Sequence, residues 1–141
     1  MKLFLKEHEA ALDKAGDRGN KAIVRIFNPC GGQTWIVYGQ DPRNKDRLWA
    51  ACDLGFGCVE LGTVWRHDLE DMRTPPLGLP LERDLHWKPG RNIEVYSGLE
   101  SISSEPPLTP SELKEKEQKE QSDKGRINMD DLTAQIKALG L

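Results

Sequence analysis

The residues best suited to chemistry lie in one short segment, Leu81–Lys88. If this segment is a strand, its side chains alternate between two faces, so Glu82, Asp84 and His86 share one face at a spacing of about 7 Å. Two carboxylates beside an imidazole could bind a divalent metal ion or act in general acid–base catalysis. The alternative, which we favour, is an outer strand whose polar face contacts water, as is usual in antiparallel sheets.

Arg83 is the one charged residue on the opposite, apolar face of the same segment. Its neighbours there are the apolar residues Leu81, Leu85 and Trp87. Because a guanidinium among apolar side chains needs a partner, we expect Arg83 to pair with a carboxylate or with the end of a helix. The sequence offers three carboxylates and does not choose between them: Asp53, Glu60 and Asp68.

The three cysteines form no recognisable metal or catalytic motif. Five residues separate Cys52 from Cys58, whereas zinc ligands occur in closer pairs and in sets of four. Cys30 lies in an Asn-Pro-Cys-Gly-Gly turn that would expose it as a nucleophile, but no basic residue or helix start follows to activate it. We therefore predict three structural or incidental thiols, no metal site and no cofactor.

A third candidate patch is the predicted loop Gly39–Asp46 together with the residue that follows it. Arg43, Lys45 and Arg47 alternate there with polar residues and could contact phosphate, but two aspartates dilute the charge. The whole chain has 20 basic and 23 acidic residues and a net charge of −3. Since nucleic-acid binding uses a larger basic face, we do not expect direct binding of DNA or RNA.

The elements that must position these residues are mostly strands. β-Branched and aromatic stretches alternate with turns rich in Gly, Pro and Asn, at intervals that suit hairpins and are too short for parallel crossovers. We therefore predict an α+β fold with an antiparallel meander sheet of four to five strands and flanking helices. The predicted strands are Lys21–Phe27, Gln33–Tyr38, Arg47–Asp53, Cys58–Val64 and Glu82–Trp87, and the predicted helices are Phe4–Lys14 and Arg66–Arg73.

Aromatic residues mark the folded part of the chain. All four Trp, both Tyr and all three Phe lie within residues 1–100, and such side chains bury the largest area per residue. We expect Trp35, Trp49 and Trp87 to be structural residues of an α+β domain over residues 1–100. A Pro- and Ser-rich linker over residues 101–110 and a helical tail over residues 111–141 are predicted to follow.

The end of the tail is predicted to form an amphipathic helix. Leu132, Ile136 and Leu139 recur at helical spacing, and Met129 precedes them after the capping residue Asn128. An apolar stripe of this kind needs a surface to cover it. It could pack on its own domain, form a homodimer with a second copy, or dock in the groove of a partner protein.

The sequence also predicts the cellular location of the chain. No apolar run approaches the roughly 20 residues that span a bilayer. Charged residues interrupt the first eleven positions, so the apolar centre of a secretory signal is missing. We expect a cytoplasmic protein without a membrane partner.

Read together, the strand segments resemble a bacterial family of unknown function, family 2958, over roughly residues 2–89. Its most specific signature matches Gly78-Leu79-Pro80-Leu81-Glu82-Arg83-Asp84. The resemblance implies a cargo protein of plasmids, integrative elements and phages, with no assigned catalytic residues. Further matching segments are Ile23–Pro29, Gln33–Tyr38, Leu48-Trp49 and Glu60–Gly62.

Cargo proteins of this kind often inhibit host restriction or CRISPR systems. The leading hypothesis is therefore a non-enzymatic protein that occupies a surface of a host protein or protein–nucleic acid complex. The alternatives are a small metal-dependent hydrolase or nuclease that uses the Glu82, Asp84 and His86 face, and a structural homo-oligomer assembled through the C-terminal helix. The predicted partner contacts are Met129, Leu132, Ile136, Leu139, Glu82, Asp84 and His86, with Arg43, Lys45 and Arg47 as a weaker patch.

Overall fold

The computed structural model of this protein describes residues 1–120 and divides the chain into two compact units. The first unit is Met1–Pro106 and the second is Pro107–Leu141. Residues 101–106, predicted as the start of a linker, thus belong to the first unit. The reason is the side chain of Ile102, which is only 1% exposed in the core.

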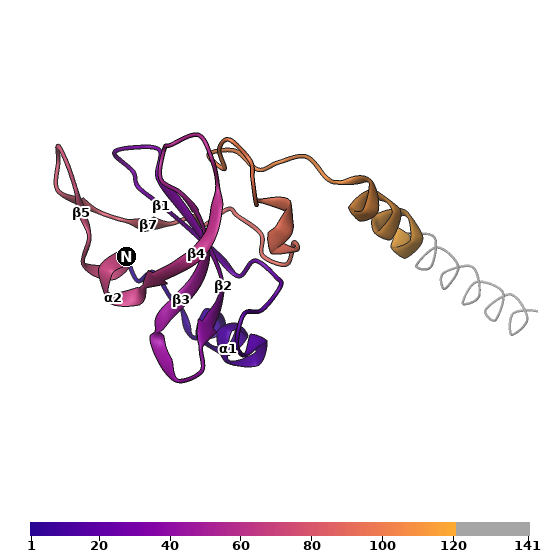
Figure 1. Ribbon diagram of the computed structural model, residues 1–141, viewed down its shortest axis with the longest axis horizontal. Coiled ribbons are helices and arrows are strands. Elements are labelled where there is room, and N and C mark those ends of the chain that lie inside the picture. Colours follow the sequence, from indigo (N-terminus) through magenta and orange to yellow (C-terminus); the bar gives the residue numbers. More distant parts are fainter. Residues whose placement is uncertain (121–141) are drawn as a thin grey trace, which may run out of the picture. The chain divides into compact units, whose positions relative to one another are not determined.

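A five-stranded antiparallel sheet forms the centre of the first unit (Figure 1). The strand order is β4-β3-β2-β1-β7, so consecutive hairpins join the first four strands as predicted. Each neighbouring pair is antiparallel, and the β2–β3 ladder shifts its register between Val37 and Gly39 and again between Gln40 and Asp41. The strands are β1 (Val24–Phe27), β2 (Thr34–Asp41), β3 (Asn44–Asp53), β4 (Glu60–Trp65) and β7 (Glu82–Arg83), and a separate two-stranded ribbon pairs β5 (Arg73–Thr74) with β6 (Leu79–Pro80).

The prediction of a loop over Gly39–Asp46 is wrong. Strands β2 and β3 include most of these residues and leave only a tight turn at Pro42–Arg43. Side chains stabilise this turn from both strands. Asp41 Oδ1 accepts a 2.9 Å hydrogen bond from the backbone N–H of Arg43, and Asn44 Oδ1 accepts one of 3.1 Å from Asp46. Asx turns of this kind let short polar residues close a hairpin without a long loop.

The predicted fifth strand is also shorter than expected. β7 contains only Glu82 and Arg83 and pairs with Phe27 and Ile26 of β1. The chain then turns at Leu85–His86, where Asp84 Oδ1 accepts a 3.0 Å hydrogen bond from the backbone N–H of His86. An aspartate that caps its own turn competes with strand extension, and here the turn prevails.

Two apolar clusters cover the two faces of the sheet. The first includes the α1 residue Leu12 and the α2 residue Leu69, with Trp35 from the sheet. The second includes Tyr96 and Ile102 from the segment that follows β7. The predicted flanking helices are present as α1 (Lys6–Ala15) and α2 (Arg66–Asp71), and a short 3₁₀ helix, η1 (Ile93–Val95), lies in the later segment.

The second unit begins with a helix over residues 110–120. A capping box closes the start of this helix, because Glu112 N–H donates to Thr109 Oγ1 at 3.3 Å and Thr109 N–H donates to Glu112 Oε1 at 3.0 Å. The predicted partner contacts of the tail lie outside the described residues: Met129, Leu132, Ile136 and Leu139.

None of the helices within residues 1–120 combines the length and the apolar content that crossing a membrane requires.

Candidate binding groove beside the Arg25–Asp84 network

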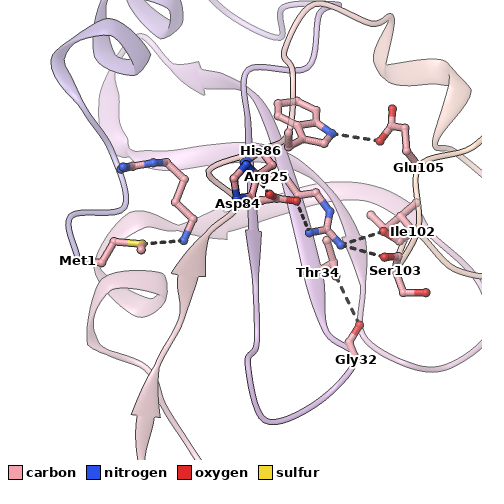
Figure 2. A network of polar contacts seen from close by, with 11 residues as sticks. Met1, Arg25, Gly32, Thr34, Asp84, His86, Ile102, Ser103 and Glu105 are labelled. Atoms are coloured by element: carbon pink, nitrogen blue, oxygen red, sulfur yellow. Dashed lines mark hydrogen bonds and ion pairs between the residues drawn. The ribbon is translucent and has the colours of Figure 1, made fainter.

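Arg25 on β1 organises the segment in which the chemistry was predicted (Figure 2). Its guanidinium donates to Asp84 Oδ2 at 2.9 Å and to the backbone carbonyls of Ile102 and Ser103, both at 3.3 Å. The Arg25 side chain is only 12% exposed, so water competes weakly for these bonds. Arg25 therefore joins three parts of the chain that are far apart in sequence.

Glu105 anchors the same region from the other side. Its carboxylate accepts from the indole N–H of Trp87 at 3.1 Å, from Tyr96 Oη at 2.5 Å and from Arg91 at 3.0 Å. Burial raises the pKa of the Tyr96 hydroxyl, and the bond to Glu105 raises it further, so Tyr96 remains a donor. The indole of Trp87 is thus bonded within the first unit, and its partner is a residue expected to lie in a linker.

The predicted arrangement of Glu82, Asp84 and His86 on one strand face is wrong. Glu82 is half-buried in β7, Asp84 is bonded to Arg25, and His86 lies exposed in the following turn. The face is lost because the strand ends at Arg83. Within residues 1–120, no group of three or more His, Cys, Asp or Glu residues is placed to hold a metal ion.

The predicted partners of Arg83 are also wrong. The guanidinium donates to the backbone carbonyl of Lys2, and the backbone N–H donates to Met1 Sδ at 3.3 Å. Of the three expected carboxylates, Asp53 is buried elsewhere, where its Oδ2 accepts from Ser101 Oγ at 3.1 Å and from the Ile102 N–H at 3.0 Å. The N-terminal segment reaches Arg83 only in the folded chain, so no local pattern pointed to it.

A groove of about 510 Å³ lies between α1 and the segment after β7. Its volume is within the range of ordinary ligand sites. Leu85 lies at this groove with 63% of its surface exposed. The groove residues are mostly apolar, with two acidic and three basic groups among them: Leu5, Glu7, His8, Ala11, Lys21, Ala22, Ile23, Val24, Arg83, Asp84, Leu85, Trp87, Pro89 and Gly90.

His8 is the titratable base of the groove. Its Nδ1 accepts a 3.0 Å hydrogen bond from the backbone N–H of Leu5, at the start of α1. Burial lowers the pKa of His8, and the nearby Arg83 lowers it further, while Glu7 raises it. The neutral imidazole is therefore favoured, which suits an apolar groove.

The basic patch predicted at the β2–β3 hairpin is largely neutralised. Lys45 pairs with Asp13 at 3.2 Å, and Arg47 pairs with Asp41 at 3.6 Å. Arg43 lies exposed at the tip of the turn. Two of the three cations thus have carboxylate partners from this chain.

Trp49 is a structural residue of the other face of the sheet. Guanidinium carbons lie over its ring from Arg18 at 4.2 Å and from Arg47 at 5.3 Å. Arg18 is held in this place because the backbones of Gly19 and Gly39 lie close together. A Cβ on Gly39 would lie 3.0 Å from the backbone nitrogen of Gly19. The loop before β1 therefore packs directly on β2.

The cysteines are dispersed in the structure. Cys52 is half-buried on β3, Cys30 lies in the β1–β2 turn, and Cys58 is exposed before β4. Burial raises the pKa of Cys52 to about 11, with a smaller contribution from Glu60. A thiol with a raised pKa is a poor nucleophile at neutral pH.

Sequence reasoning missed Arg25, Glu105 and the exposure of Leu85. Arg25 alternates with the apolar residues Val24 and Ile26, so alternation places it on the opposite face of the strand and names no partner for it. Glu105 lies between serine and proline residues that suggested a linker. The sequence did show that both residues are charged and lie close to the predicted core. A charge alone, however, does not specify its partner.

A family model described as a protein of unknown function, DUF2958, matches residues 1–104. The chain belongs to this family. The match confirms the resemblance and extends it beyond Pro89, to the carbonyls of Ile102 and Ser103 that Arg25 binds. No curated protein and no solved structure matches the chain. The family domain therefore includes the segment that covers the second face of the sheet.

Proposed function

We propose that this DUF2958 protein is a non-enzymatic binding protein that acts by occupying a surface of a host protein or protein–nucleic acid complex. The observation that carries the proposal is the groove beside α1 with the exposed Leu85 at its rim. A large aliphatic side chain held in the open next to an apolar groove is typical of an interface centre. The occupant we propose is an apolar side chain of the partner.

The groove is supported by a rigid frame, which favours binding without large rearrangement. Arg25 fixes the Asp84 turn on one side of Leu85, and Glu105 holds Trp87 on the other side. Fixed walls reduce the entropy that binding would otherwise cost. The charged groups around the groove have both signs, which suits a partner surface of mixed polarity.

The family context supplies the proposed class of partner. The resemblance associates DUF2958 proteins with plasmids, integrative elements and phages, whose small cargo proteins often act against host defence. We propose a restriction or CRISPR complex in the cytoplasm as the target, inhibited by occlusion of a surface. In this proposal the groove supplies the apolar anchor, and the family context supplies the class of target.

The proposal is tested by capture of host proteins on the full-length chain and on Leu85→Asp. A carboxylate at the rim would be desolvated on binding, so we expect the affinity of the captured partner to fall about tenfold or more. The affinity is then measured with the purified partner by calorimetry.

The matched control is Leu77→Asp. Leu77 is 74% exposed in the β5–β6 turn and is not a groove residue, so this variant introduces the same charge at a similarly exposed leucine. We expect it to bind as the unchanged chain does. Equal loss of binding in both variants, or no captured partner, would contradict the proposal.

A further inference from the structure

β4 is the outermost strand of the sheet, and part of its outer side carries no partner. Just before the strand, the backbone groups of Val59 point away from β3 and form hydrogen bonds to another segment. The Val59 N–H donates to Leu99 O at 2.7 Å, and the Val59 carbonyl accepts from Gly98 N–H at 2.9 Å. In an antiparallel strand the backbone groups of successive residues point to alternate sides. The N–H and carbonyl groups of Leu61, Thr63 and Trp65 therefore point outward as well.

These outward groups are left open along the sheet edge. Within residues 1–120, the backbones of Leu61, Thr63 and Trp65 have no hydrogen bond to a segment other than β3. β4 also lacks most of the features that usually protect an edge, since it contains no Lys or Pro, its register with β3 is unbroken, and its one charged residue, Glu60, lies at its start. In Figure 1, β4 lies in front of the other strands of the sheet.

The opposite edge of the sheet is protected. β7 contains only two residues, and the N–H of Arg83 donates to Met1 Sδ at 3.3 Å. The sheet thus has one long open edge, on β4. A single open edge can be satisfied by one two-fold-related copy, which leaves no edge for further addition.

We propose that two copies of this chain pair through β4, antiparallel, with Thr63 opposite Thr63 and Leu61 opposite Trp65. The register follows from the geometry, because outward-pointing residues must face one another across the new ladder. Val59 is already bonded to Gly98 and Leu99, and α2 begins at Arg66, so the open stretch is centred on Thr63. Only this register uses all three open positions of both copies.

The side chains of β4 are self-complementary in this register. Leu61, Thr63 and Trp65 share one face of the strand, and a two-fold axis normal to the sheet keeps the partner's residues on the same face. Trp65, which is 42% exposed, would then cover the half-buried Leu61 of the second copy. Aromatic–aliphatic and Thr–Thr pairs across strands are favourable.

The other face of the strand has room for the pairing. Gly62 would lie opposite Val64, and nothing lies within 4 Å of a Cβ placed on Gly62. The flanking residues Glu60 and Arg66 are opposite in charge, but Arg66 is already paired with Glu9 at 3.1 Å. The pairing therefore depends on backbone bonds and on the Leu61–Trp65 contact.

Sedimentation equilibrium of the full-length chain over a concentration series tests the proposal. We expect a reversible dimer whose mass approaches twice 15.9 kDa. Thr63→Pro removes the outward N–H, a position at which an edge strand tolerates proline, so this variant should remain folded and become monomeric. Thr63→Val keeps the N–H and should still dimerise, and circular dichroism checks the fold of both variants.

A crosslinking experiment tests the register without a destabilising substitution. Cysteines at the two-fold position should form a disulfide, because directly opposed residues of a hydrogen-bonded pair lie about 5.5 Å apart at Cα. Thr63→Cys, in a chain with Cys30 and Cys58 replaced by serine, should give a covalent dimer when oxidised glutathione takes up the two electrons. Gly62→Cys in the same background should not, since position 62 faces position 64.

The outcomes separate this inference from the proposed function. A monomer at every concentration would overturn the β4 dimer, and so would a dimer that persists in Thr63→Pro and gives no crosslink at position 63. Leu85→Asp, which tests the groove, should leave the dimer mass unchanged.

Discussion

Arg25 and Asp84 are joined twice, although they lie 59 residues apart in the sequence. The guanidinium donates to Asp84 Oδ2 at 2.9 Å, and the backbone N–H of Asp84 donates to the Arg25 carbonyl at 2.9 Å. The backbone bond thus extends the β1–β7 ladder by one position, and the side-chain pair stabilises the end of the ladder. This double link fixes the turn that holds Leu85 beside the groove.

Arg25→Ala should destabilise the domain by about 2–4 kcal/mol, because it leaves the Asp84 carboxylate and two backbone carbonyls without their donor. Asp84→Asn keeps the shape and the turn-capping oxygen, so we expect a smaller loss of about 1–2 kcal/mol. Urea unfolding measures both. Lys45→Ala, which breaks an exposed pair with Asp13, is the control and should cost under about 0.5 kcal/mol. Equal losses at Arg25 and Lys45 would contradict the structural role of Arg25.

The end of the family domain can be tested by truncation. A chain of residues 1–106 should be as stable as the full-length protein, whereas a chain of residues 1–100 loses the buried Ile102 and the donors to Asp53. Ile102→Ala alone should cost about 2–4 kcal/mol. Thermal unfolding of the three chains measures the difference. Equal stability of the chains ending at residues 100 and 106 would place the domain boundary earlier.

Two histidines should titrate on opposite sides of the usual value of 6.5. Burial lowers the pKa of His8, so its contribution to stability is complete above pH 6.5 and falls as the pH drops below that value. The hydrogen bond to Asp46 raises the pKa of the exposed His67, so its contribution is present at low pH and is lost as the pH rises through the raised value.

An NMR titration of the imidazole resonances checks both directions at once. His67→Ala should remove the transition at higher pH and leave that of His8 in place. A His8 transition above 6.5 would show that the nearby Glu7 outweighs burial, and the groove would then be more polar than the structure has it.

Cys52 should resist alkylation in the folded protein. Its pKa of about 11 leaves little thiolate at pH 8, while Cys58 is exposed. Iodoacetamide at pH 8, followed by mass spectrometry, should modify Cys58 first and Cys52 only after unfolding. Glu60→Gln should lower the Cys52 pKa slightly, since burial is the larger cause. Rapid modification of native Cys52 would show that β3 opens locally.

Most of the sheet was predictable because its signals are local. Alternating β-branched residues and Gly-, Pro- and Asn-rich turns place β1 to β4 to within a few residues, and short intervals require antiparallel hairpins. The fifth strand was overextended because Glu82–Trp87 also alternates in polarity. In the structure the chain turns after Asp84 instead, where Asp84 Oδ1 accepts from the His86 N–H and Oδ2 binds Arg25.

Of Glu82, Asp84 and His86, which alternation placed on one strand face, only Asp84 lines the groove. Asp84 is a partner of Arg25, and the open residue beside it is Leu85. Side chains on one strand can be sorted by alternation only while the strand continues. Once the chain turns, their directions depend on the contacts of the turn.

The sequence by itself determined the α+β class, the meander order of the first four strands and the family. These follow from periodicity, turn residues and a local signature, all of which operate over fewer than about ten residues. Only the tertiary structure decided that residues 101–106 belong to the domain, that Arg83 binds the N-terminal segment, and that β4 is left open. The physical reason is that distant segments must meet before a charged side chain finds its partner or a strand edge is covered. Burial of the whole core determines which distant segments meet.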